Sequence, residues 1–334
     1  MKWYEASAEP ITVSTRVRLA RNLSNVPFPS SMTTEQMLET NRKIADTICN
    51  GNSALARELK CIEMDKISEP EALAMVERHI ISPNFSKNRQ GRMLILSSDE
   101  SISIMLGEED HIRIQVLLPG LKIEEAYDTA DRIDTLLGET LPIAYDDELG
   151  FLTECPTNLG TGLRASVMLH LPAIEHSGEI NQISETVSKI GLTVRGTYGE
   201  GSKCAASLYQ FSNQVTLGLT EQMAIQNLIS VTNQIIDKEQ KARNSLNKTL
   251  LEDYVCRAWG ILTNARLLSG KEMKELVSRV KLGIDCGIIG AEYKQMPIKL
   301  LIETQPNMLL EKYNTKTPQA RDEKRAEIFR NNLI

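Results

Sequence analysis

The spacing of apolar residues changes about two thirds of the way along this 334-residue chain. Before about residue 218, short segments that alternate between apolar and polar residues predict half-buried strands, with helical repeats between them. From Thr220 to Ile289, apolar residues recur every three or four positions, as expected of helices that bury one side. We therefore predict a mixed domain of strands and helices over residues 1–240 and an α-helical domain over residues 241–334.

Capping signals and apolar stripes mark individual helices. Thr33 and Gln36 have the spacing of a capping box at the start of the segment 33–49, and Ser269 and Glu272 repeat that spacing. Two further helices carry apolar stripes that are expected to face the protein interior. The first stripe, which stops at Gly191, consists of Ile180, Ile183, Val187 and Ile190. The second consists of Met223, Leu228, Val231 and Ile235.

Arginines occupy the polar side of four predicted strands. Residues two apart in a strand face the same way, so Arg16 and Arg18 in STRVRLARN face away from the apolar side. The same alternation places Arg113 and Arg164 on the polar side of their strands, and Arg195 ends a fourth. For any single strand, a solvated sheet face is the simpler interpretation. Four such strands favour a polyphosphate site, because guanidinium groups bind phosphate oxygens in bidentate pairs.

Two carboxylates and a cysteine accompany these arginines. Glu109 shares the polar side with Arg113, and Glu200 follows the Arg195 strand. By residue chemistry, such carboxylates are equally ion-pair partners of the arginines or ligands for another guanidinium. Cys155 begins the segment CPTNLGTGLRASVM, which matches neither G-x-x-x-x-G-K-[ST] nor G-x-G-x-x-G. A free cysteine is most often a small buried hydrophobe, so this segment does not define its role.

The composition excludes several classes of protein. Hydrophobic residues make up 41% of the chain and charged residues 25%, which is ordinary for a soluble protein. The net charge of −6 argues against nucleic-acid binding by the whole surface. No apolar run approaches the roughly 20 residues of a membrane helix, and the N-terminal segment lacks the pattern of a signal peptide. The six cysteines form no C-x-x-C pair, so we expect no metal site and reduced thiols in a cytoplasmic protein.

Four segments resemble the signature blocks of the ATP:guanidino phosphotransferases, or phosphagen kinases, and occur in the same order: STRVRLARN, EEDHIRIQ, CPTNLGTGLRAS and RGTYGE. ERHIISP, SNQVTLG and RDEKRA are similar to the bacterial protein-arginine kinases of that family. The first block begins at Ser14, which leaves no room for the small N-terminal domain that phosphagen kinases close over free arginine or creatine. The resemblance implies an α+β fold with a largely antiparallel sheet flanked by helices, and transfer of the ATP γ-phosphate to arginines of proteins.

The resemblance also implies which residues form the site. Glu109 and Glu200 would orient the acceptor guanidinium, with Glu109 as the base, and Cys155 matches a reactive cysteine that the arginines would hold as a thiolate. Mg²⁺ is expected to bind the ATP and not a cage of protein carboxylates. The expected ATP contacts are Ser14, Thr15, Arg16, Val17, Arg18, His79, Arg113, Arg164, Ala165, Ser166, Val167, Met168, Arg195, Gly196, Thr197, Tyr198, Gly199 and Glu200.

One departure from the family pattern and one tail motif complete the comparison. Gly107 stands where the family has asparagine before Glu108-Glu109-Asp110, which predicts a looser turn. By composition the tail is a solvated charged helix, but the resemblance makes it a phosphoarginine pocket. The pocket residues would be Arg321, Asp322, Glu323, Lys324, Arg325 and Ala326, with Arg325 at the phosphate and Asp322 at the guanidinium.

The resemblance implies partners as well. They are an activator of the McsA type, a repressor of the CtsR type, a protease complex of the ClpC type and further copies of the chain, without direct contact to nucleic acid or membrane. Two alternative functions remain open. One is a kinase for free arginine or other small guanidino compounds, and the other is an adaptor module that reads phosphoarginine on client proteins.

Overall fold

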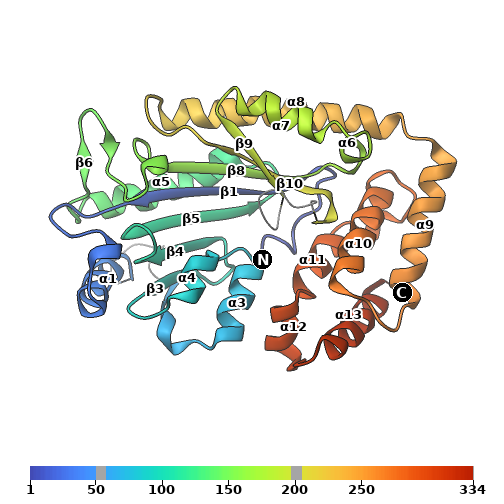
Figure 1. The fold of residues 1–334 in the computed structure, drawn as a ribbon, viewed down its shortest axis with the longest axis horizontal. Helices are drawn as coiled ribbons and strands as arrows, with labels where there is room; N and C mark the ends of the chain where they lie inside the picture. Colours follow the sequence, from blue (N-terminus) through green and yellow to red (C-terminus); the bar gives the residue numbers. More distant parts are fainter. Residues whose placement is uncertain (50–57, 197–204, 334) are drawn as a thin grey trace.

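The computed structural model describes residues 1–49, 58–196 and 205–333, and a single large sheet organises them (Figure 1). Within these residues, eight strands follow the order β2-β3-β4-β5-β1-β8-β10-β9, and each neighbouring pair is antiparallel. This confirms the expected antiparallel sheet. The strands are β1 (Thr12–Arg21), β2 (Leu59–Glu63), β3 (Met93–Ser97), β4 (Ile102–Leu106), β5 (Ile112–Pro119), β8 (Leu163–His170), β9 (Leu192–Gly196) and β10 (Leu208–Asn213), and β6 (Tyr145–Asp146) pairs with β7 (Gly150–Phe151) in a separate hairpin.

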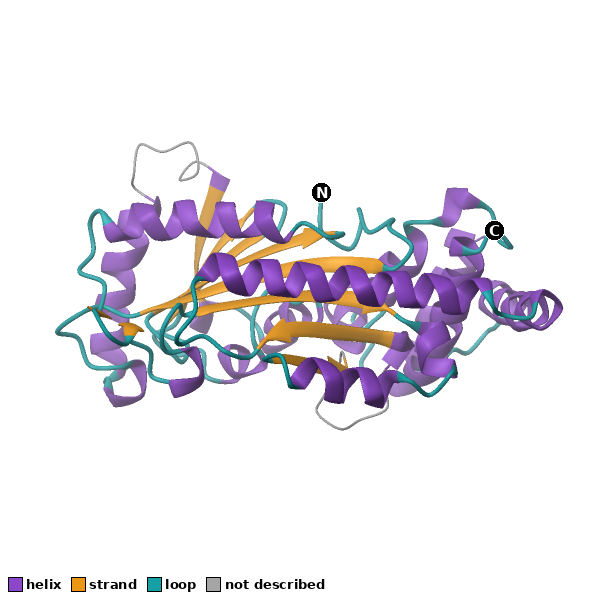
Figure 2. Cartoon of the chain, turned by 90° about the horizontal axis from the view of Figure 1, so that it is seen from above, coloured by secondary structure: helices purple, strands orange, loops and turns teal. Residues whose placement is uncertain are grey.

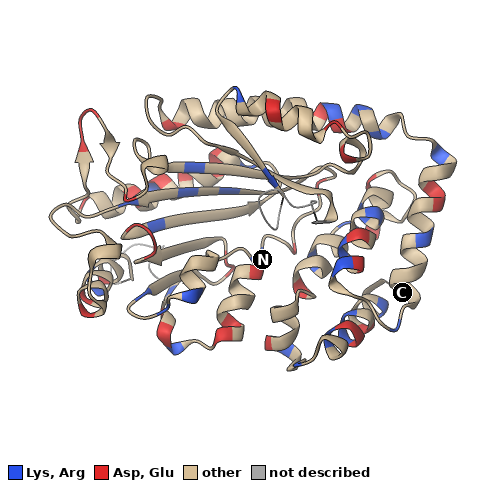
Figure 3. Cartoon of the chain, in the orientation of Figure 1, with Lys and Arg blue, Asp and Glu red and all other residues tan. Residues whose placement is uncertain are grey.

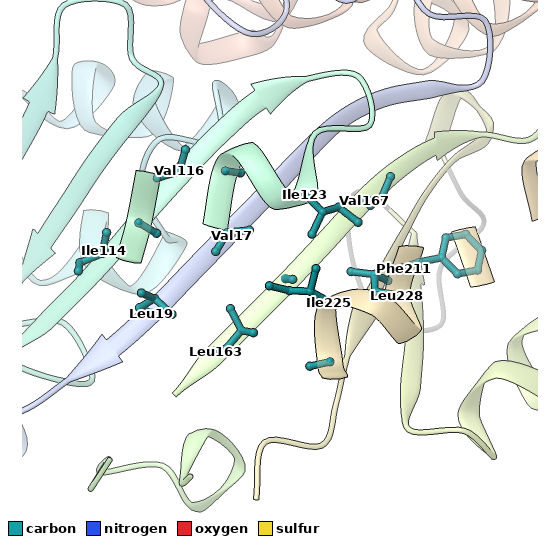
Figure 4. Packing of buried hydrophobic residues seen from close by; sticks show 14 of the residues in the cluster. Val17, Leu19, Ile114, Val116, Ile123, Leu163, Val167, Phe211, Ile225 and Leu228 are labelled. Atoms are coloured by element: carbon teal, nitrogen blue, oxygen red, sulfur yellow. The ribbon is translucent and has the colours of Figure 1, made fainter. Parts of the chain in front are cut away.

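Helices cover one face of the sheet (Figure 2). These are α1 (Thr34–Cys49), α5 (Ile123–Gly138), α7 (Ile180–Ser188) and α8 (Glu221–Asn244), which share one apolar core with the strands. The predicted alternation is confirmed in β1, where Val17 and Leu19 are fully buried in this core. Figure 4 shows Ile225 of α8 beside these strands. Each fully buried aliphatic side chain contributes about 1.5–3 kcal/mol, so the core fixes which face of each strand points inward.

The predicted helix starts are confirmed, whereas two stripe residues were placed wrongly. Thr33 N donates to Gln36 Oε1 at 2.9 Å and Gln36 N donates to Thr33 Oγ1 at 3.3 Å, which completes the capping box of α1. Met223 is 61% exposed, because Ala224 and Ile225 of the same turn face the sheet instead. Ile190 is 48% exposed because α7 ends at Ser188.

The C-terminal part is helical, as predicted, and packs against one end of the polar sheet face. It contains α9 (Lys248–Asn264), α10 (Gly270–Asp285), α11 (Met296–Glu303), α12 (Pro306–Tyr313) and α13 (Pro318–Leu333). Leu117 of β5 and Met168 of β8 join its apolar core, so these helices close one end of the arginine-bearing side. The predicted boundary at residue 240 lies inside α8, and the division into 1–240 and 241–334 stays a prediction.

Short helices complete the fold. They are α3 (Glu69–Glu77), α4 (Pro83–Lys87) and α6 (Pro172–His176), with 3₁₀ turns at Pro29–Ser31, Met64–Lys66, Pro156–Asn158, Ala205–Ser207 and Ala291–Tyr293. In the part of the chain that the structure describes, no helix combines the length and apolarity that crossing a bilayer requires.

A buried ionic network joins the sheet to α8 and α10. Arg243 of α8 binds Glu239 at 2.7 Å and Asp285 of α10 at 3.1 Å. Its Nη2 also donates to the backbone oxygen of His170 at 3.1 Å. The His170 ring lies 2.9 Å from Ser278 Oγ and is fully buried. Burial lowers the pKa of His170 well below its usual value, and the charges of Lys281 and Arg243 lower it further.

We expect this histidine to make the fold sensitive to acid. The unfolded chain protonates histidine near pH 6.5, whereas folded His170 resists protonation, so the unfolded state binds more protons as the pH falls below that value. Stability is therefore retained above about pH 6.5 and lost below it, by at most about 1.4 kcal/mol per pH unit for one such group. Urea unfolding at pH 7 and pH 5 measures the loss, and His170→Gln should reduce it. An equal pH dependence in this variant would assign the effect to other groups.

Candidate active site

Lysines and arginines lie on several adjacent strands of the sheet (Figure 3). The strand register places the arginines on its polar side, as the alternation predicted. Arg18 of β1 lies opposite Arg164 of β8, and Arg16 lies opposite Ser166. Arg113 extends the group in β5, and Arg195 of β9 lies opposite Gln210 of β10. We call Arg16, Arg18, Arg113, Arg164 and Arg195 the arginine cluster.

The arginine cluster concentrates like charge on half-buried side chains, with Arg195 at its exposed end. Burial lowers the pKa of Arg16 to about 10, with further contributions from Arg113 and Arg164. Burial also lowers the pKa of Arg18, and Arg16, Arg113 and Arg164 add to this effect. The pKa of Arg164 is lowered by burial and then by Arg195 and Arg113. Cations held this close to one another are stabilised by an anion between them.

The hydrogen bonds of the cluster leave donors for such an anion. Arg16 Nη2 donates to the neutral Gln210 Oε1 at 2.9 Å. Within the described residues, the Nε atoms of Arg16 and Arg164 are buried and have no hydrogen-bond partner. Arg21 differs, since its guanidinium binds Asp134 at 2.7 Å. Unsatisfied buried donors are costly, so the polar face is suited to a ligand rich in acceptor oxygens, such as a polyphosphate.

Two neighbouring carboxylates meet Arg113 in different ways. Glu108, which the sequence did not single out, is buried and accepts from Arg113 Nη1 and Ser82 Oγ, each at 2.5 Å. Burial raises the pKa of Glu108, but Arg113 and the hydrogen bonds outweigh burial and leave the pKa lowered. The Glu109 side chain is 38% exposed and lies 3.8 Å from Arg113 Nη2. Glu108 thus holds Arg113, and Glu109 keeps oxygens accessible to a further cation.

Cys155 precedes the 3₁₀ turn Pro156–Asn158 and is partly exposed. Its Sγ lies 3.0 Å from Thr157 Oγ1. Glu154 N donates to Asp110 Oδ1 at 2.9 Å, so the Cys155 segment lies against the turn that carries Glu109, at the Arg113 edge of the arginine cluster. An exposed carboxylate and a thiol at that edge can face a second, positively charged ligand.

A small pocket adjoins the other side of the cluster. Its lining includes Trp3, Ser14, Arg16, His79, Met168 and Gln210. His79 stands edge-on to Trp3 with ring centroids 5.6 Å apart, and its backbone is left-handed with a φ of 64°. Burial, aided by Arg16, lowers the pKa of His79 to about 3, so the ring is neutral near pH 7. Apart from Arg16, this lining is uncharged and partly aromatic, which suits the uncharged part of a nucleotide next to its phosphates.

The predicted ATP contacts divide between the two faces. The side chains on the arginine side are Ser14, Arg16, Arg18, Arg113, Arg164, Ser166, Met168 and Arg195, with His79 beside them. Thr15, Val17, Ala165 and Val167 are fully buried on the opposite side of their strands, so only their backbone can reach a ligand on the arginine side. Gly196 ends β9. Thr197, Tyr198, Gly199 and Glu200 lie outside the described residues.

Glycines in two loops permit close backbone packing. Gly160 has a φ of +105°, and a Cβ there would overlap the backbone oxygen of Thr216. Gly107 has a φ of +76°, and a Cβ there would lie 2.7 Å from Asn41 Nδ2 of α1. The Gly107 turn is closed by its N–H, which donates to His111 O at 3.0 Å. These glycines therefore shape the loops that bring Cys155 and Glu109 to the site.

The tail motif lies on α13 and is partly engaged within the chain. Arg325 is 1% exposed, and its guanidinium donates to Thr304 O at 3.0 Å, Leu268 O at 2.7 Å and Asp322 Oδ1 at 2.6 Å. Its Nη2 points towards Gly270: a Cβ added to that glycine would lie 3.8 Å from Arg325 Nη2. Lys324 and Glu327 pair at 2.7 Å on the surface. Arg325 and Asp322 thus hold one another, while Arg321 and Glu323 are more accessible.

Comparison with known proteins agrees with this geometry. A family model described as "ATP:guanido phosphotransferase, C-terminal catalytic domain" matches residues 39–242, and one described as "Protein-arginine kinase McsB C-terminal domain" matches residues 248–334. A protein-arginine kinase of Caldanaerobacter subterraneus subsp. tengcongensis is 45% identical over 95% of each chain. Another, from Brevibacillus brevis, is 44% identical over 98% of this chain and 93% of its own.

Solved structures share the fold. A lombricine kinase matches with a TM-score of 0.62 and 23% identity, over 73% of this chain and 70% of its own. A duplicated taurocyamine kinase from Schistosoma mansoni, solved with bound transition-state analogue components, also gives 0.62, with 26% identity over 79% of this chain and 38% of its own. The chain therefore belongs to the ATP:guanido phosphotransferase family of enzymes, and within that family to the protein-arginine kinases.

Proposed function

We propose that this enzyme transfers the γ-phosphate of ATP to the guanidinium of arginine residues in proteins. The observation that supports this best is the division of charge across the site. Arginines lie on one side, among them Arg16 and Arg164 with buried, unsatisfied Nε donors, and Glu109 and Cys155 lie on adjacent segments beside Arg113. A polyphosphate fits the first region and a guanidinium the second. Relatives named protein-arginine kinases support an acceptor arginine that belongs to a protein.

The arginine cluster would position ATP for in-line transfer. Phosphoryl transfer depends mainly on positioning and on cancellation of the charge that spreads over the phosphoryl oxygens. The five guanidinium groups would contact those oxygens, and His79 with Ser14 and Met168 would line the nucleoside side. Magnesium would bind the ATP phosphates and neutralise part of their negative charge. Among the described residues no group of His, Cys, Asp or Glu is arranged to hold a metal by itself.

Glu109 and Cys155 would act on the acceptor. As the nitrogen–phosphorus bond forms and the bond to ADP breaks, the attacking nitrogen releases one proton, which Glu109 would accept. The high pKa of arginine means that this proton leaves as the bond forms and not before it. Cys155 would orient the guanidinium, and Glu200 is assigned a similar role although it lies outside the described residues.

Regulation and partners belong to the same proposal. We expect an McsA-type activator, a CtsR-type repressor and a ClpC-type protease complex in protein quality control under stress, in the cytoplasm, together with self-association. Phosphoarginine would bind around Arg321, Asp322, Glu323, Lys324, Arg325 and Ala326. Since Arg325 is buried and engaged by backbone oxygens, the more accessible Arg321 would be the first to meet the phosphate.

The deciding experiment is incubation of the purified chain with Mg-ATP and an arginine-rich protein, followed by mass spectrometry under conditions that preserve acid-labile phosphoarginine. We expect phosphoarginine on the protein and little on free arginine in a parallel assay. Faster phosphorylation of free arginine would favour a small-molecule guanidino kinase. Phosphoarginine binding without any ATP turnover would favour the adaptor module.

Cys155→Ser tests the role of the thiol. If Cys155 only orients the guanidinium, phosphoryl transfer should fall by roughly tenfold without vanishing, because the arginine cluster and Glu109 remain. Iodoacetamide should inactivate the parent enzyme and leave the variant unaffected. Equal inactivation of both proteins would show that another site is responsible.

Tail variants separate binding from folding. Arg325→Ala leaves the buried oxygens of Thr304 and Leu268 without their donor, so we expect a loss of about 2–4 kcal/mol in unfolding free energy. Arg321→Ala changes a more accessible residue and should leave the fold and ATP turnover intact while weakening phosphoarginine binding in calorimetry. Parental phosphoarginine affinity in Arg321→Ala would place the pocket elsewhere.

A further inference from the structure

A buried amide and carboxylate lie between the segments that carry Glu109 and Cys155. Asn22 follows β1, and Asp110 follows Glu109 in the turn before β5. Both side chains are 1% exposed, and Asn22 Nδ2 donates to Asp110 Oδ1 at 2.7 Å. A buried carboxylate needs hydrogen-bond donors to offset its desolvation, so this contact constrains both residues.

The pair extends directly to the cysteine segment. Asp110 Oδ1 also accepts from Glu154 N at 2.9 Å, and Asn22 Nδ2 also donates to Leu152 O at 3.0 Å. On the other side, Asn22 Oδ1 accepts from His111 N at 2.9 Å. The route from Glu109 to Cys155 therefore consists of one peptide bond, one hydrogen bond and another peptide bond.

Each of the two segments is also fixed internally. The Gly107 N–H donates to His111 O across the carboxylate turn, and Thr153 Oγ1 donates to Cys155 O at 2.8 Å. The relative placement of two such rigid segments then depends on the bonds that join them. A misplacement of about 1 Å between groups that act on one substrate can reduce a rate by roughly a hundredfold.

We propose that Asn22 and Asp110 are positioning residues that set the separation between the Glu109 carboxylate and the Cys155 thiol, and thereby orient the acceptor guanidinium. The inference rests on the proposed function, which assigns the guanidinium to these two groups. Asn22 and Asp110 act through their neighbours and do not touch the substrate. The arginine cluster is held by other bonds, so nucleotide binding does not depend on the pair.

The test compares two nearly isosteric variants. Asn22→Asp turns an acceptor towards Asp110, and we expect kcat for protein phosphorylation to fall by roughly tenfold or more with a nearly parental KM for ATP. Asp110→Asn is the matched control, because its amide oxygen can still accept from both Asn22 Nδ2 and Glu154 N. We expect Asp110→Asn to keep most of the parental kcat. A merely structural role would instead lower the melting temperature and change both kinetic constants together.

A second measurement does not require the acceptor. The alkylation rate of Cys155 by iodoacetamide, read by mass spectrometry, should change by roughly threefold or more in Asn22→Asp and stay near the parental rate in Asp110→Asn. The exposed Cys256 on α9 is the internal control and should not change. Should Asn22→Asp not fold, Asn22→Ser, whose shorter side chain cannot span the bond to Asp110, takes its place.

The outcomes separate the two proposals. Parental kcat and a parental Cys155 alkylation rate in folded Asn22→Asp would overturn the positioning role, as would an equal loss of kcat in Asp110→Asn. A parent enzyme that never phosphorylates protein arginine would overturn the proposed function instead. In that case the alkylation rates still decide whether the pair fixes the position of Cys155.

Discussion

Glu109→Gln is expected to bind ATP with nearly parental affinity and to lose phosphoryl transfer by roughly a hundredfold or more, the usual scale for a general base. The substitution keeps the shape of the side chain and removes its charge and basicity. Glu109 is partly exposed and its contact with Arg113 is long, at 3.8 Å. Removing the Glu109 charge therefore leaves the shorter, buried bond between Glu108 and Arg113 in place. Single-turnover transfer and nucleotide titration measure the two effects separately.

The adjacent carboxylate provides the matched control. Glu108→Gln removes the buried partner of Arg113 and Ser82, so it should weaken ATP binding and lower the melting temperature. Transfer at a parental rate in Glu109→Gln would remove Glu109 from the role of base. An identical response of both variants would also contradict the separate roles assigned to them.

Arg18→Met should reduce kcat/KM by roughly a hundredfold or more, because one preorganised donor to the developing phosphoryl charge is lost. The same substitution should leave the melting temperature of the nucleotide-free protein unchanged or higher. Arg16, Arg113 and Arg164 all disfavour the charge of Arg18 in the folded state, so its removal relieves repulsion. Calorimetric unfolding with and without ATP checks both parts.

Arg243→Met is the contrasting control. Arg243 is buried, and it pairs with Glu239 and Asp285, whose side chains are 0% and 3% exposed. Its removal takes the only cation from Glu239, which keeps two backbone donors, and leaves Asp285 with Lys281 alone among the described residues. We expect a loss of about 3–5 kcal/mol in unfolding free energy. A similar loss of stability in Arg18→Met would assign the arginine cluster a structural role.

The sequence predicted what depends on local periodicity and missed what depends on distant contacts. Alternation in β1, β5 and β8 placed the arginines on one side, because a strand fixes the direction of each side chain. It could not reveal Gln210 as the acceptor for Arg16, or Asn22 as the partner of Asp110, since these contacts cross 194 and 88 residues of chain. Alternation placed Glu109 beside Arg113, but both glutamates lie in the turn before β5, and Glu108 is the one that binds Arg113 and Ser82.

Helix phase and the tail show the same limit. Met223 fits the apolar spacing of α8, yet the sheet meets the neighbouring side of that helix, so Ala224 and Ile225 are buried instead. Arg325 has the sequence context of a surface charge, but its partners Leu268 and Thr304 come from other segments of the helical part. The burial and partners of a residue cannot be predicted from its neighbours in sequence when another helix or strand forms its surroundings.

The assembly of the arginine cluster from separate strands has a consequence for folding. A phosphate site built on one loop can form as soon as that loop does, whereas here Arg16, Arg113, Arg164 and Arg195 meet only after the five strands β5, β1, β8, β10 and β9 have paired. A slip of one residue in the pairing of any strand would turn its arginine into the apolar layer under α5 and α8. Long-range antiparallel pairing is also a slow part of folding, because distant segments must first come together. Nucleotide binding should therefore appear late in refolding, and partial chains that lack any of these strands should not acquire it.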